Sequence, residues 1–414
     1  MSRGTAQNAV VDPSDTAGTV TVSVVLPCLD ERDSVGACVD EALGALAAHG
    51  VSGEVIVVDN GSSDGSASIA EAHGARVVSE PRRGYGQALR TGFGAASGDV
   101  VVMADADRTY PLDRLRDLVE PIRRGEADLV LGGRLADSKR ATMPVLHRRL
   151  GTPLLTFLIS RASGGLPIRD SQSGFRAFDR HRIDGLGLRS TGMELASEML
   201  IKARRAGLRI REVPTGYRAR VGQSKLDTFA DGWRHLRTIL LLAPDLLLVW
   251  PGALLAAAGL LMTIVSLVRP AGIDVGSLQW QPIFFSTIAL VLGTGAFLAG
   301  AVLAHRSDVV RAEVHHRFTW VGTRAFVRAT AVFGVVSVLS GLAIDTVLFF
   351  AWVNGGSAPS RGVALASLAQ TLLILGPAVG GFGIVARLAD DRRALEAMID
   401  EGVADQTPSS ASGS

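Results

Sequence analysis

Short apolar runs alternate with amphipathic segments along the first half of the chain. The runs Val20–Leu26, Glu54–Val58 and Val100–Met103 predict buried strands, because a strand covered on both faces loses its alternation of polar and apolar positions. Amphipathic segments such as Ser34–Ala48 and Pro111–Arg124 predict helices between the strands. Strands and helices at this short spacing are typical of βαβ units, so we expect an α/β domain with a mostly parallel sheet.

From Gly132 to Arg182 this alternation breaks down. Basic residues precede a short apolar stretch, Pro153–Ile159, which cannot span a bilayer at this length. The stretch predicts a helix that either lies on a membrane surface or packs against the domain, and the sequence leaves both interpretations open.

Four longer apolar segments follow, and each has the roughly 20 residues that a helix needs to cross a hydrocarbon core of about 30 Å. They carry few or no charges, with Asp345 in the third segment as the exception. We expect these four membrane helices near residues 247–267, 283–304, 331–353 and 363–386. The predicted organisation is a disordered tail at 1–19, an α/β domain at 20–237, a membrane domain at 238–390 and a cytosolic tail at 391–414.

The distribution of charge predicts the orientation of these segments. Arginine is concentrated in the loop at 305–328 and after the fourth segment, so the positive-inside rule assigns the α/β domain, this loop and the C-terminal tail to the cytosolic side. Residues 1–19 carry no secretory signal, and we expect a multi-pass protein of the plasma membrane. Because no long basic run or zinc-ligand spacing occurs, we expect no nucleic-acid partner.

Two carboxylates, Asp105 and Asp107, follow the buried strand Val100–Met103. On a regular strand, positions i and i+2 share a face, so the pair would converge on one ligand. Carboxylate oxygens suit Mg²⁺ or Mn²⁺, ions that usually complete their shell with the phosphates of a substrate. The alternative is that one of the two acids caps the helix that Pro111 helps to start.

Three polar loops follow predicted parallel strands, at Pro27–Glu31, Asp59–Ser66 and Asp105–Asp107. The carboxyl ends of parallel strands meet at one edge of a sheet, where α/β proteins place their ligands. Acidic residues in all three loops are costly unless they bind a cation or a ligand rich in hydrogen-bond donors, such as a nucleoside. The pattern therefore predicts one crevice for both.

Residues 21–240 contain seven motifs in order that resemble those of family 2 glycosyltransferases. They are Ser23–Glu31 (SVVLPCLDE), Val57–Gly65 (VVDNGSSDG), Arg83–Gly86 (RGYG), Asp105–Asp107 (DAD), Gly132–Arg134 (GGR), Asp170–Arg176 (DSQSGFR) and Arg220–Leu226 (RVGQSKL). The chain is most similar to the dolichol-phosphate mannose and glucose synthase branch, also called polyprenyl-phosphate glycosyltransferases. This resemblance implies a Rossmann-like catalytic domain of GT-A fold, followed by the four membrane helices.

The resemblance also implies roles for the residues that match. Pro27, Glu31 and Asp59 would hold the nucleoside of a UDP- or GDP-hexose, Asp105 would contact its ribose or the metal, and Ala106 would contact the ribose through its backbone.

At the reacting end, the resemblance implies that Asp107 binds the divalent ion together with Asp105, and that Asp170 faces the sugar. Arg134, Arg220, Ser224 and Lys225 would face phosphates of the donor or of a polyprenyl phosphate acceptor, a role suited to charge-assisted hydrogen bonds.

The catalytic set is therefore expected to be Asp107, Asp170 and Arg134. Two residues depart from the family pattern: Asp30 stands where Asn is common, and Thr109 stands where relatives supply a further metal ligand from Gln.

We therefore expect an inverting hexosyltransferase that moves glucose or mannose from a nucleotide sugar to polyprenyl phosphate. One alternative is a processive polysaccharide synthase, although the Gln-x-x-Arg-Trp motif of that class does not occur in the sequence. The other is a non-enzymatic carrier or translocator of a glycolipid, which the intact set of carboxylates disfavours.

Overall fold

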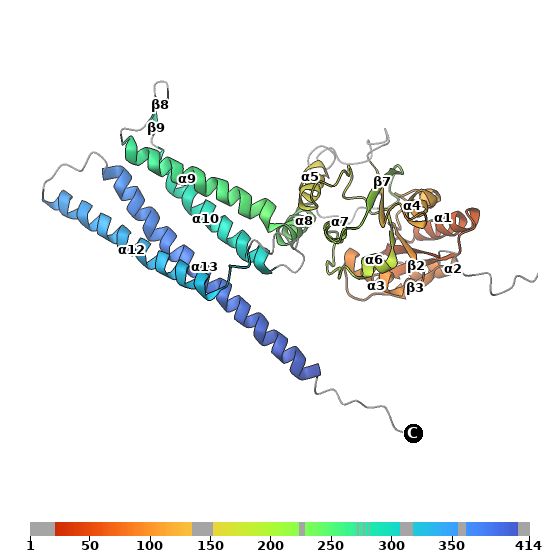
Figure 1. Ribbon diagram of the computed structural model, residues 1–414. Coiled ribbons are helices and arrows are strands. Elements are labelled where there is room, and N and C mark those ends of the chain that lie inside the picture. Colours follow the sequence, from red (N-terminus) through yellow and green to blue (C-terminus); the bar gives the residue numbers. More distant parts are fainter. Residues whose placement is uncertain are drawn as a thin grey trace, which may run out of the picture. The chain divides into compact units, whose positions relative to one another are not determined.

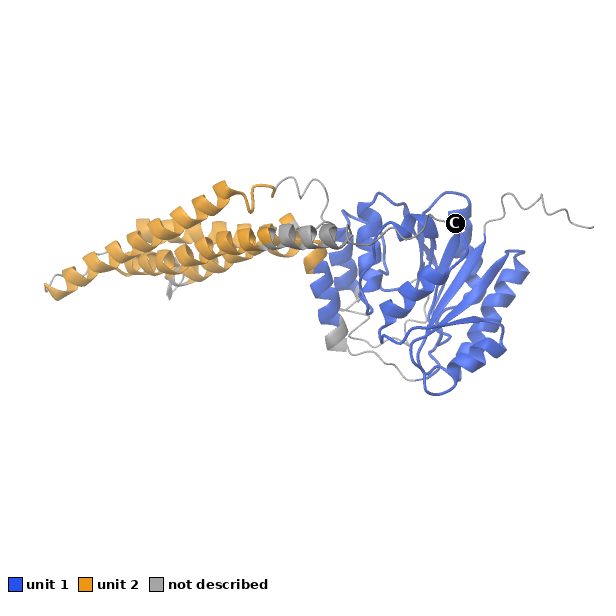
Figure 2. Cartoon of the chain, turned by 90° about the horizontal axis from the view of Figure 1, so that it is seen from below, with its two compact units in different colours: residues 1–239 blue, residues 240–414 orange. Residues whose placement is uncertain are grey.

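The computed structural model describes residues 21–134, 152–222, 228–270, 273–275, 278–280, 282–306, 318–354 and 362–404. The chain divides into two compact units, residues 1–239 and 240–414, which Figure 2 colours blue and orange.

The first unit is an α/β domain built on a seven-stranded sheet (Figure 1). Its strands are β1 (Val22–Cys28), β2 (Gly53–Asp59), β3 (Arg76–Ser79), β4 (Val100–Met103), β5 (Leu129–Gly133), β6 (Arg176–Asp179) and β7 (Ile210–Pro214). Their order across the sheet is β3-β2-β1-β4-β6-β5-β7. All neighbours pair in parallel except β6, which is antiparallel to both β4 and β5. The expected mostly parallel sheet is confirmed.

Helices cover both faces of this sheet. The helices that begin in this unit are α1 (Val35–Ala48), α2 (Ser66–Ala72), α3 (Tyr85–Ala95), α4 (Leu115–Arg123), which follows the 3₁₀ turn Leu112–Arg114, α5 (Thr152–Ala162), α6 (Arg180–Asp184), α7 (Leu195–Arg205) and α8 (Thr228–Leu242). On one face, α1 and α4 pack with alternate side chains of β1, such as Val24 and Leu26, in the main core. On the other face, Phe93 of α3 makes an edge-to-face contact with Phe178 of β6, with ring centroids 5.0 Å apart.

The second unit contains four helices that are long and apolar enough to cross a membrane. They are α9 (Trp250–Val268), which continues the π-helical turn Asp245–Val249, α10 (Ile283–Arg306), α12 (Arg324–Val353) and α13 (Gly362–Ala404). The candidate spans within them are Asp245–Val268, Phe285–His305, Arg324–Val353 and Gly362–Leu388. A short hairpin of β8 (Ile273–Val275) and β9 (Leu278–Trp280) lies between α9 and α10.

Glycines bring α9 and α10 into close contact. A Cβ atom on Gly293 of α10 would lie 2.2 Å from the backbone nitrogen of Ala256, and one on Gly259 of α9 would lie 2.5 Å from that of Leu290. In α12 and α13, Gly334 and Gly376 face each other's carbonyl oxygens in the same way. Small residues at these positions let backbones approach, which is how helices pack in membranes.

Candidate active site

A pocket of about 380 Å³ lies at the carboxyl edge of the sheet. Its lining comes from the end of β1, from the segments that follow β1 to β5 and β7, from the segment that precedes β6, and from residues at α3, α7 and α8. Because β6 runs against its neighbours, its beginning lies at the edge where the parallel strands end. Segments next to all seven strands of the sheet thus contribute to one pocket, at the place where open α/β sheets bind ligands.

The two carboxylates of the DAD motif both line this pocket. β4 ends at Met103, so Asp105 and Asp107 lie on the loop after the strand and not on one face of it. The expectation that they share one face of a strand is therefore wrong, although the loop brings both to the same pocket. Ala106 also lines it, and the pair does not act as a side-chain cap for a helix.

Asp107 is buried, with 5% of its side chain exposed, and each of its oxygens has a partner. Oδ1 accepts hydrogen bonds from the backbone N–H of Thr109 at 3.0 Å and from its hydroxyl at 2.5 Å. Oδ2 lies 3.2 Å from Nη1 of Arg220. Thr109 stands at the position where members of the resembled family supply a metal ligand from Gln. Here its two hydrogen bonds hold Asp107 in place.

Asp105 accepts a hydrogen bond from the hydroxyl of Tyr85 at 2.7 Å through Oδ1. Burial and the neighbouring charge of Asp107 raise the pKa of Asp105 from 3.8 to about 6, and the bond from Tyr85 opposes this rise. Within the described residues, Oδ2 of Asp105 accepts no hydrogen bond. This oxygen is available to a cation or to a donor group of a ligand.

Arg134 and Asp170 form a buried, bidentate ion pair. Nε and Nη2 of Arg134 donate to the two carboxylate oxygens at 2.7 and 2.8 Å, and the backbone N–H of Arg134 adds a bond of 3.1 Å. The hydrogen bonds and charge of Arg134 lower the pKa of Asp170, although burial acts to raise it. Asp170 is fully buried and does not line the pocket, whereas Arg134 does. The arrangement makes Asp170 an anchor for Arg134.

Only some of the residues that were predicted to hold the nucleoside come together in the structure. Pro27 and Glu31 line the pocket, but Asp59 does not, and its Oδ1 instead accepts a hydrogen bond from the N–H of Ser62 at 3.1 Å. The predicted phosphate ligands Ser224 and Lys225 lie outside the described residues. Arg220 lines the pocket and binds both Asp107 and Glu31.

Asn60, which sequence reasoning missed, connects the end of β2 to the loop before α3. Its side-chain amide donates to the carbonyl oxygens of Glu80 and Arg82 at 2.8 Å each, and its Oδ1 accepts from the N–H of Gly84 at 2.7 Å. Gly84 has a φ of +146°, and a Cβ atom there would lie 2.4 Å from the carbonyl oxygen of Thr191. Only glycine fits this turn, which places the neighbouring Tyr85 at the pocket.

The chain has three tyrosines, and all of them line the pocket. Tyr110 and Tyr217 meet edge to face with ring centroids 5.6 Å apart, and the guanidinium of Arg134 lies 5.6 Å from the Tyr217 ring centroid. The hydroxyl of Tyr110 accepts a hydrogen bond from the N–H of Gly174 at 2.7 Å. The low number of tyrosines in the sequence is a signal that could have pointed to these three residues.

Arg176 is a second residue whose role was missed. It is fully buried and donates to the carbonyl oxygens of Ser171, Ser173 and Ala196 at 2.7–2.9 Å. Burial lowers the pKa of its guanidinium to about 10. These bonds fix the loop that carries Asp170 against α7.

The acids present fit a divalent cation whose remaining ligands come from a substrate. No cluster of three or more His, Cys, Asp or Glu that could hold a metal ion occurs among the residues that the structure describes. Mg²⁺ and Mn²⁺ are commonly held by one or two carboxylates together with phosphates and water. Asp105 and Asp107 supply such a set, with one oxygen without a hydrogen bond and one that contacts only Arg220.

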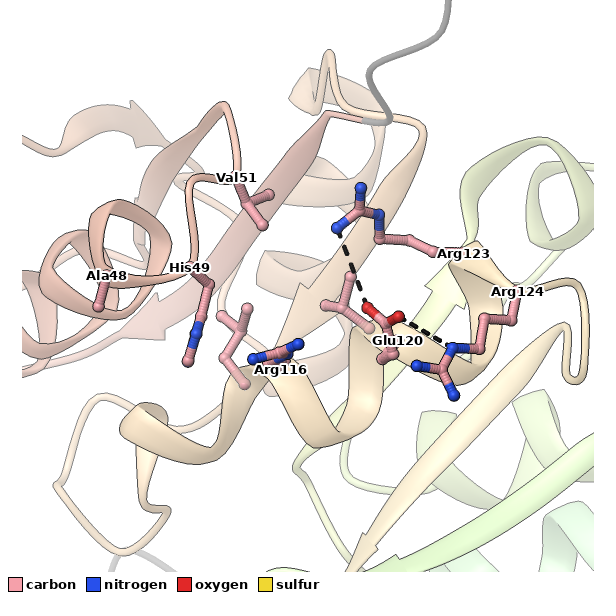
Figure 3. Close-up of a pocket in the computed structure, with 9 residues that line it drawn as sticks. Ala48, His49, Val51, Arg116, Glu120, Arg123 and Arg124 are labelled. Atoms are coloured by element: carbon pink, nitrogen blue, oxygen red, sulfur yellow. Dashed lines mark hydrogen bonds and ion pairs between the residues drawn. The ribbon is translucent and has the colours of Figure 1, made fainter.

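A second pocket, of about 420 Å³, lies between α1 and α4 at the opposite, amino edge of the sheet (Figure 3). Basic side chains surround it, but Glu120 pairs with Arg123 at 3.9 Å and with Arg124 at 3.0 Å. Both arginines lie at the C-terminal end of α4, where positive charge stabilises the helix. Local helix stability therefore accounts for this basic surface.

Comparisons with known proteins agree with this architecture. The family model described as Glycosyl transferase family 2 matches residues 23–185. The low-salt glycan biosynthesis hexosyltransferase Agl6 of Haloferax volcanii is 35% identical over 358 residues, which cover 86% of this chain and 85% of that protein. The dolichyl-phosphate hexose transferase of the same organism is 34% identical over 218 residues, which cover 51% of this chain and 89% of that protein.

Among solved structures, glucosyl-3-phosphoglycerate synthase from Mycobacterium tuberculosis, in complex with Mn²⁺, UDP and glucosyl-3-phosphoglycerate, is 32% identical. The match covers 53% of this chain and 79% of that one, with a TM-score of 0.45. Because the TM-score is below 0.5, this likeness supports no conclusion about the site.

Proposed function

The chain belongs to glycosyl transferase family 2, and from this premise we propose that it transfers a hexose from a nucleotide sugar to polyprenyl phosphate, with inversion at the anomeric carbon. The observation that carries the proposal is the single pocket that combines the carboxylates Asp105 and Asp107 with the guanidinium groups of Arg134 and Arg220. Such a pocket is suited to a diphosphate with a cation on one side and a phosphate nucleophile on the other.

The donor is proposed to bind with its nucleoside near Pro27 and Glu31 and its diphosphate near Asp105 and Asp107. A divalent cation held by these two acids would neutralise the diphosphate that leaves. Glucose and mannose, carried by UDP or GDP, are the proposed donors. Both sugars are hexoses, and the names of the two relatives above specify a hexose and no further detail of the donor.

The acceptor is proposed to be a phosphomonoester, whose second pKa lies near about 6, so that it is mostly a dianion at neutral pH. This nucleophile needs an oriented site more than it needs a base. Asp170 takes Nε and Nη2 of Arg134 and leaves Nη1 without a partner among the described residues. Arg134 is thus held rigidly with one N–H edge free to donate to a phosphate oxygen.

The membrane unit supports a lipid acceptor, because a polyprenyl tail stays in the bilayer while its phosphate is in water. α5 adds support from the first unit: Ile159 is fully buried, whereas Leu154 and Phe157 are 58% and 60% exposed. α5 thus packs through one face and exposes apolar side chains on the other. We propose that this exposed face contacts the cytosolic membrane surface.

The test uses membranes that contain the full-length protein, incubated with radiolabelled UDP-glucose, GDP-mannose or UDP-N-acetylglucosamine and a polyprenyl phosphate. We expect one donor to give a sugar phosphate that extracts into organic solvent. Asp107→Asn should lower the rate on the order of 100-fold or more, whereas Asp33→Asn, an acid whose side chain is 83% exposed, should not. Label in high-molecular-weight polymer, or a normal rate for Asp107→Asn, would contradict the proposal.

A further inference from the structure

Arg220 lies between two acids of the pocket. Its Nη2 donates to Oε1 of Glu31 at 3.1 Å, and its Nη1 lies 3.2 Å from Oδ2 of Asp107. The Nε atom of the same guanidinium is buried and has no hydrogen-bond partner among the residues that the structure describes. The contact with Glu31 is a hydrogen bond at the long end of the range for charged groups, whereas the contact with Asp107 is an ion pair without hydrogen-bond geometry. The Nε–H is among the donors left unused. The guanidinium of Arg220 is therefore held in this position although its contacts there are not the best that it could make.

The backbone keeps Arg220 at this position. The N–H of Arg218 donates to the carbonyl oxygen of Thr109 at 2.8 Å, and the N–H of Val221 donates to that of Asp107 at 3.1 Å. The side chain of Arg218 points elsewhere and binds Glu41 and Asp113, each at 2.8 Å. The segment 218–221 is thus fixed along the DAD loop, and only the guanidinium of Arg220 reaches its acids.

Only one oxygen of Asp107 is suited to bind a cation, and Arg220 contacts that same oxygen. Oδ1 is occupied by the two hydrogen bonds from Thr109, which leaves Oδ2. A divalent ion on Oδ2 would meet the positive charge of Arg220 within a few ångströms in a site where Asp107 is 5% exposed. Like charges at such a distance repel strongly where water is largely excluded. Cation and guanidinium therefore compete for this oxygen.

We propose that Arg220 is a built-in counter-ion, which occupies the cation's position on Asp107 while the donor is absent and turns to the donor's diphosphate when the cation binds. The inference rests on the proposed function, because it needs the cation and the diphosphate at Asp107. The side chain of Arg220 is 29% exposed, so it has room to turn. Its unused Nε–H and both Nη groups match phosphate oxygens.

This arrangement couples the two ligands of the pocket. The cation alone must displace Arg220 without giving it a new partner, so it binds weakly. The nucleoside diphosphate supplies that partner and lowers the cost of displacement. Each ligand therefore tightens the binding of the other by the same factor, as linkage requires.

The test measures binding of Mn²⁺ to the full-length protein in detergent, without nucleotide, from the loss of the electron paramagnetic resonance signal of free Mn²⁺. Arg220→Gln removes both the competitor and its charge, and we expect it to bind Mn²⁺ about five- to tenfold more tightly than the parent protein. Arg211 lies on β7 and its charge pairs with Glu126. Arg211→Gln is therefore the matched control and should leave the affinity for Mn²⁺ unchanged. Arg220→Lys keeps the charge and should give little of the gain.

A second titration adds saturating UDP, and then GDP, to the same proteins. The nucleotide that binds should increase the affinity for Mn²⁺ more in the parent protein than in Arg220→Gln. The reason is that the variant has no guanidinium that could turn to the diphosphate. Equal or weaker binding of Mn²⁺ alone by Arg220→Gln, with its thermal unfolding unchanged, would overturn the inference. If Asp107→Asn binds Mn²⁺ as well as the parent does, the cation site of the proposed function fails instead. Should Arg220→Gln not fold, tight binding by Arg220→Lys would overturn the inference as well.

Discussion

Asp105 is a carboxylate whose charge lowers the stability of the folded protein. Burial and the charge of Asp107 raise its pKa from 3.8 to about 6, so the folded protein binds this proton more tightly than the unfolded chain does. The carboxylate form therefore costs stability above about pH 6. Groups of this kind persist at functional sites because the ligand, when bound, compensates for their charge.

Replacement of this carboxylate should stabilise the protein. At pH 7.5 we expect Asp105→Asn to raise the free energy of unfolding by roughly 1–3 kcal/mol, and the gain should shrink as the pH falls through about 6 towards 4. Thermal unfolding of the full-length protein in detergent between pH 4 and 8 measures this. Asp33→Asn, which alters an exposed acid, should give no such pH dependence. A variant that is less stable than the parent at pH 7.5 would contradict the assigned environment.

The pair of Arg134 and Asp170 should show strong coupling. Removal of either partner leaves a buried charge alone, so Asp170→Asn and Arg134→Gln should each cost about 3–5 kcal/mol of unfolding free energy. The double variant should lose clearly less than the two losses added together. The comparison pair is Asp128 with Arg209, an arginine 55% exposed, whose coupling should stay below about 1 kcal/mol. Additive losses at Arg134 and Asp170 would mean that the bidentate contact does not form.

At this scale the sequence predicts that Glu31, Asp105 and Asp107 gather at one pocket, but not what they bind within the protein. These three acids were recognisable because they follow strands in the chain, and Pro27 because it stands near the end of β1. Asp170 was expected to face the sugar, whereas its carboxylate holds Arg134. Contacts of this type join residues tens of positions apart, and no local pattern records them.

At the scale of elements, β1, β2, β4 and β5 were predictable because each contains a continuous apolar run. The parallel strand β7 was not predicted, because its sequence IREVP places two charged residues between apolar ones. β6 was not, because its four residues, Arg176–Asp179, mix two charged and two apolar positions. Its buried arginine bonds backbone carbonyls from other segments, which a propensity argument cannot foresee. The amphipathic helix α8 reaches to Leu242, so the end of the first unit falls inside a helix.

Glycine packing between α9 and α10 gives a prediction with an internal control. A methyl group on Gly293 would lie 2.2 Å from the Ala256 nitrogen, so Gly293→Ala must separate the two helices and should cost about 1–3 kcal/mol of unfolding free energy. Gly295 lies on the same helix with nothing within 4 Å of its added Cβ, so Gly295→Ala should be neutral or slightly stabilising. Thermal unfolding in detergent separates the two. Equal effects of the two variants would show that α9 and α10 do not pack as described.

At the scale of the molecule, the distribution of arginine predicts that α12 begins on the cytosolic side and ends outside the cell. Ala325 and Asn354 are exposed residues near its two ends, and the native Cys28 and Cys38 are both buried. In intact cells, a membrane-impermeant maleimide should label Asn354→Cys at once. Ala325→Cys should react only after the membrane is made permeable. The reverse pattern would invert the proposed orientation, and equal labelling would argue against a spanning helix.

The three tyrosines have a practical consequence. Because Tyr85, Tyr110 and Tyr217 are the whole tyrosine content and all lie at the pocket, an isotope or fluorine atom built into tyrosine marks this site and nothing else. Protein grown on 3-fluorotyrosine should give three fluorine resonances. Their movement during a titration would report which candidate sugar nucleotide enters, without any change to the amino-acid sequence.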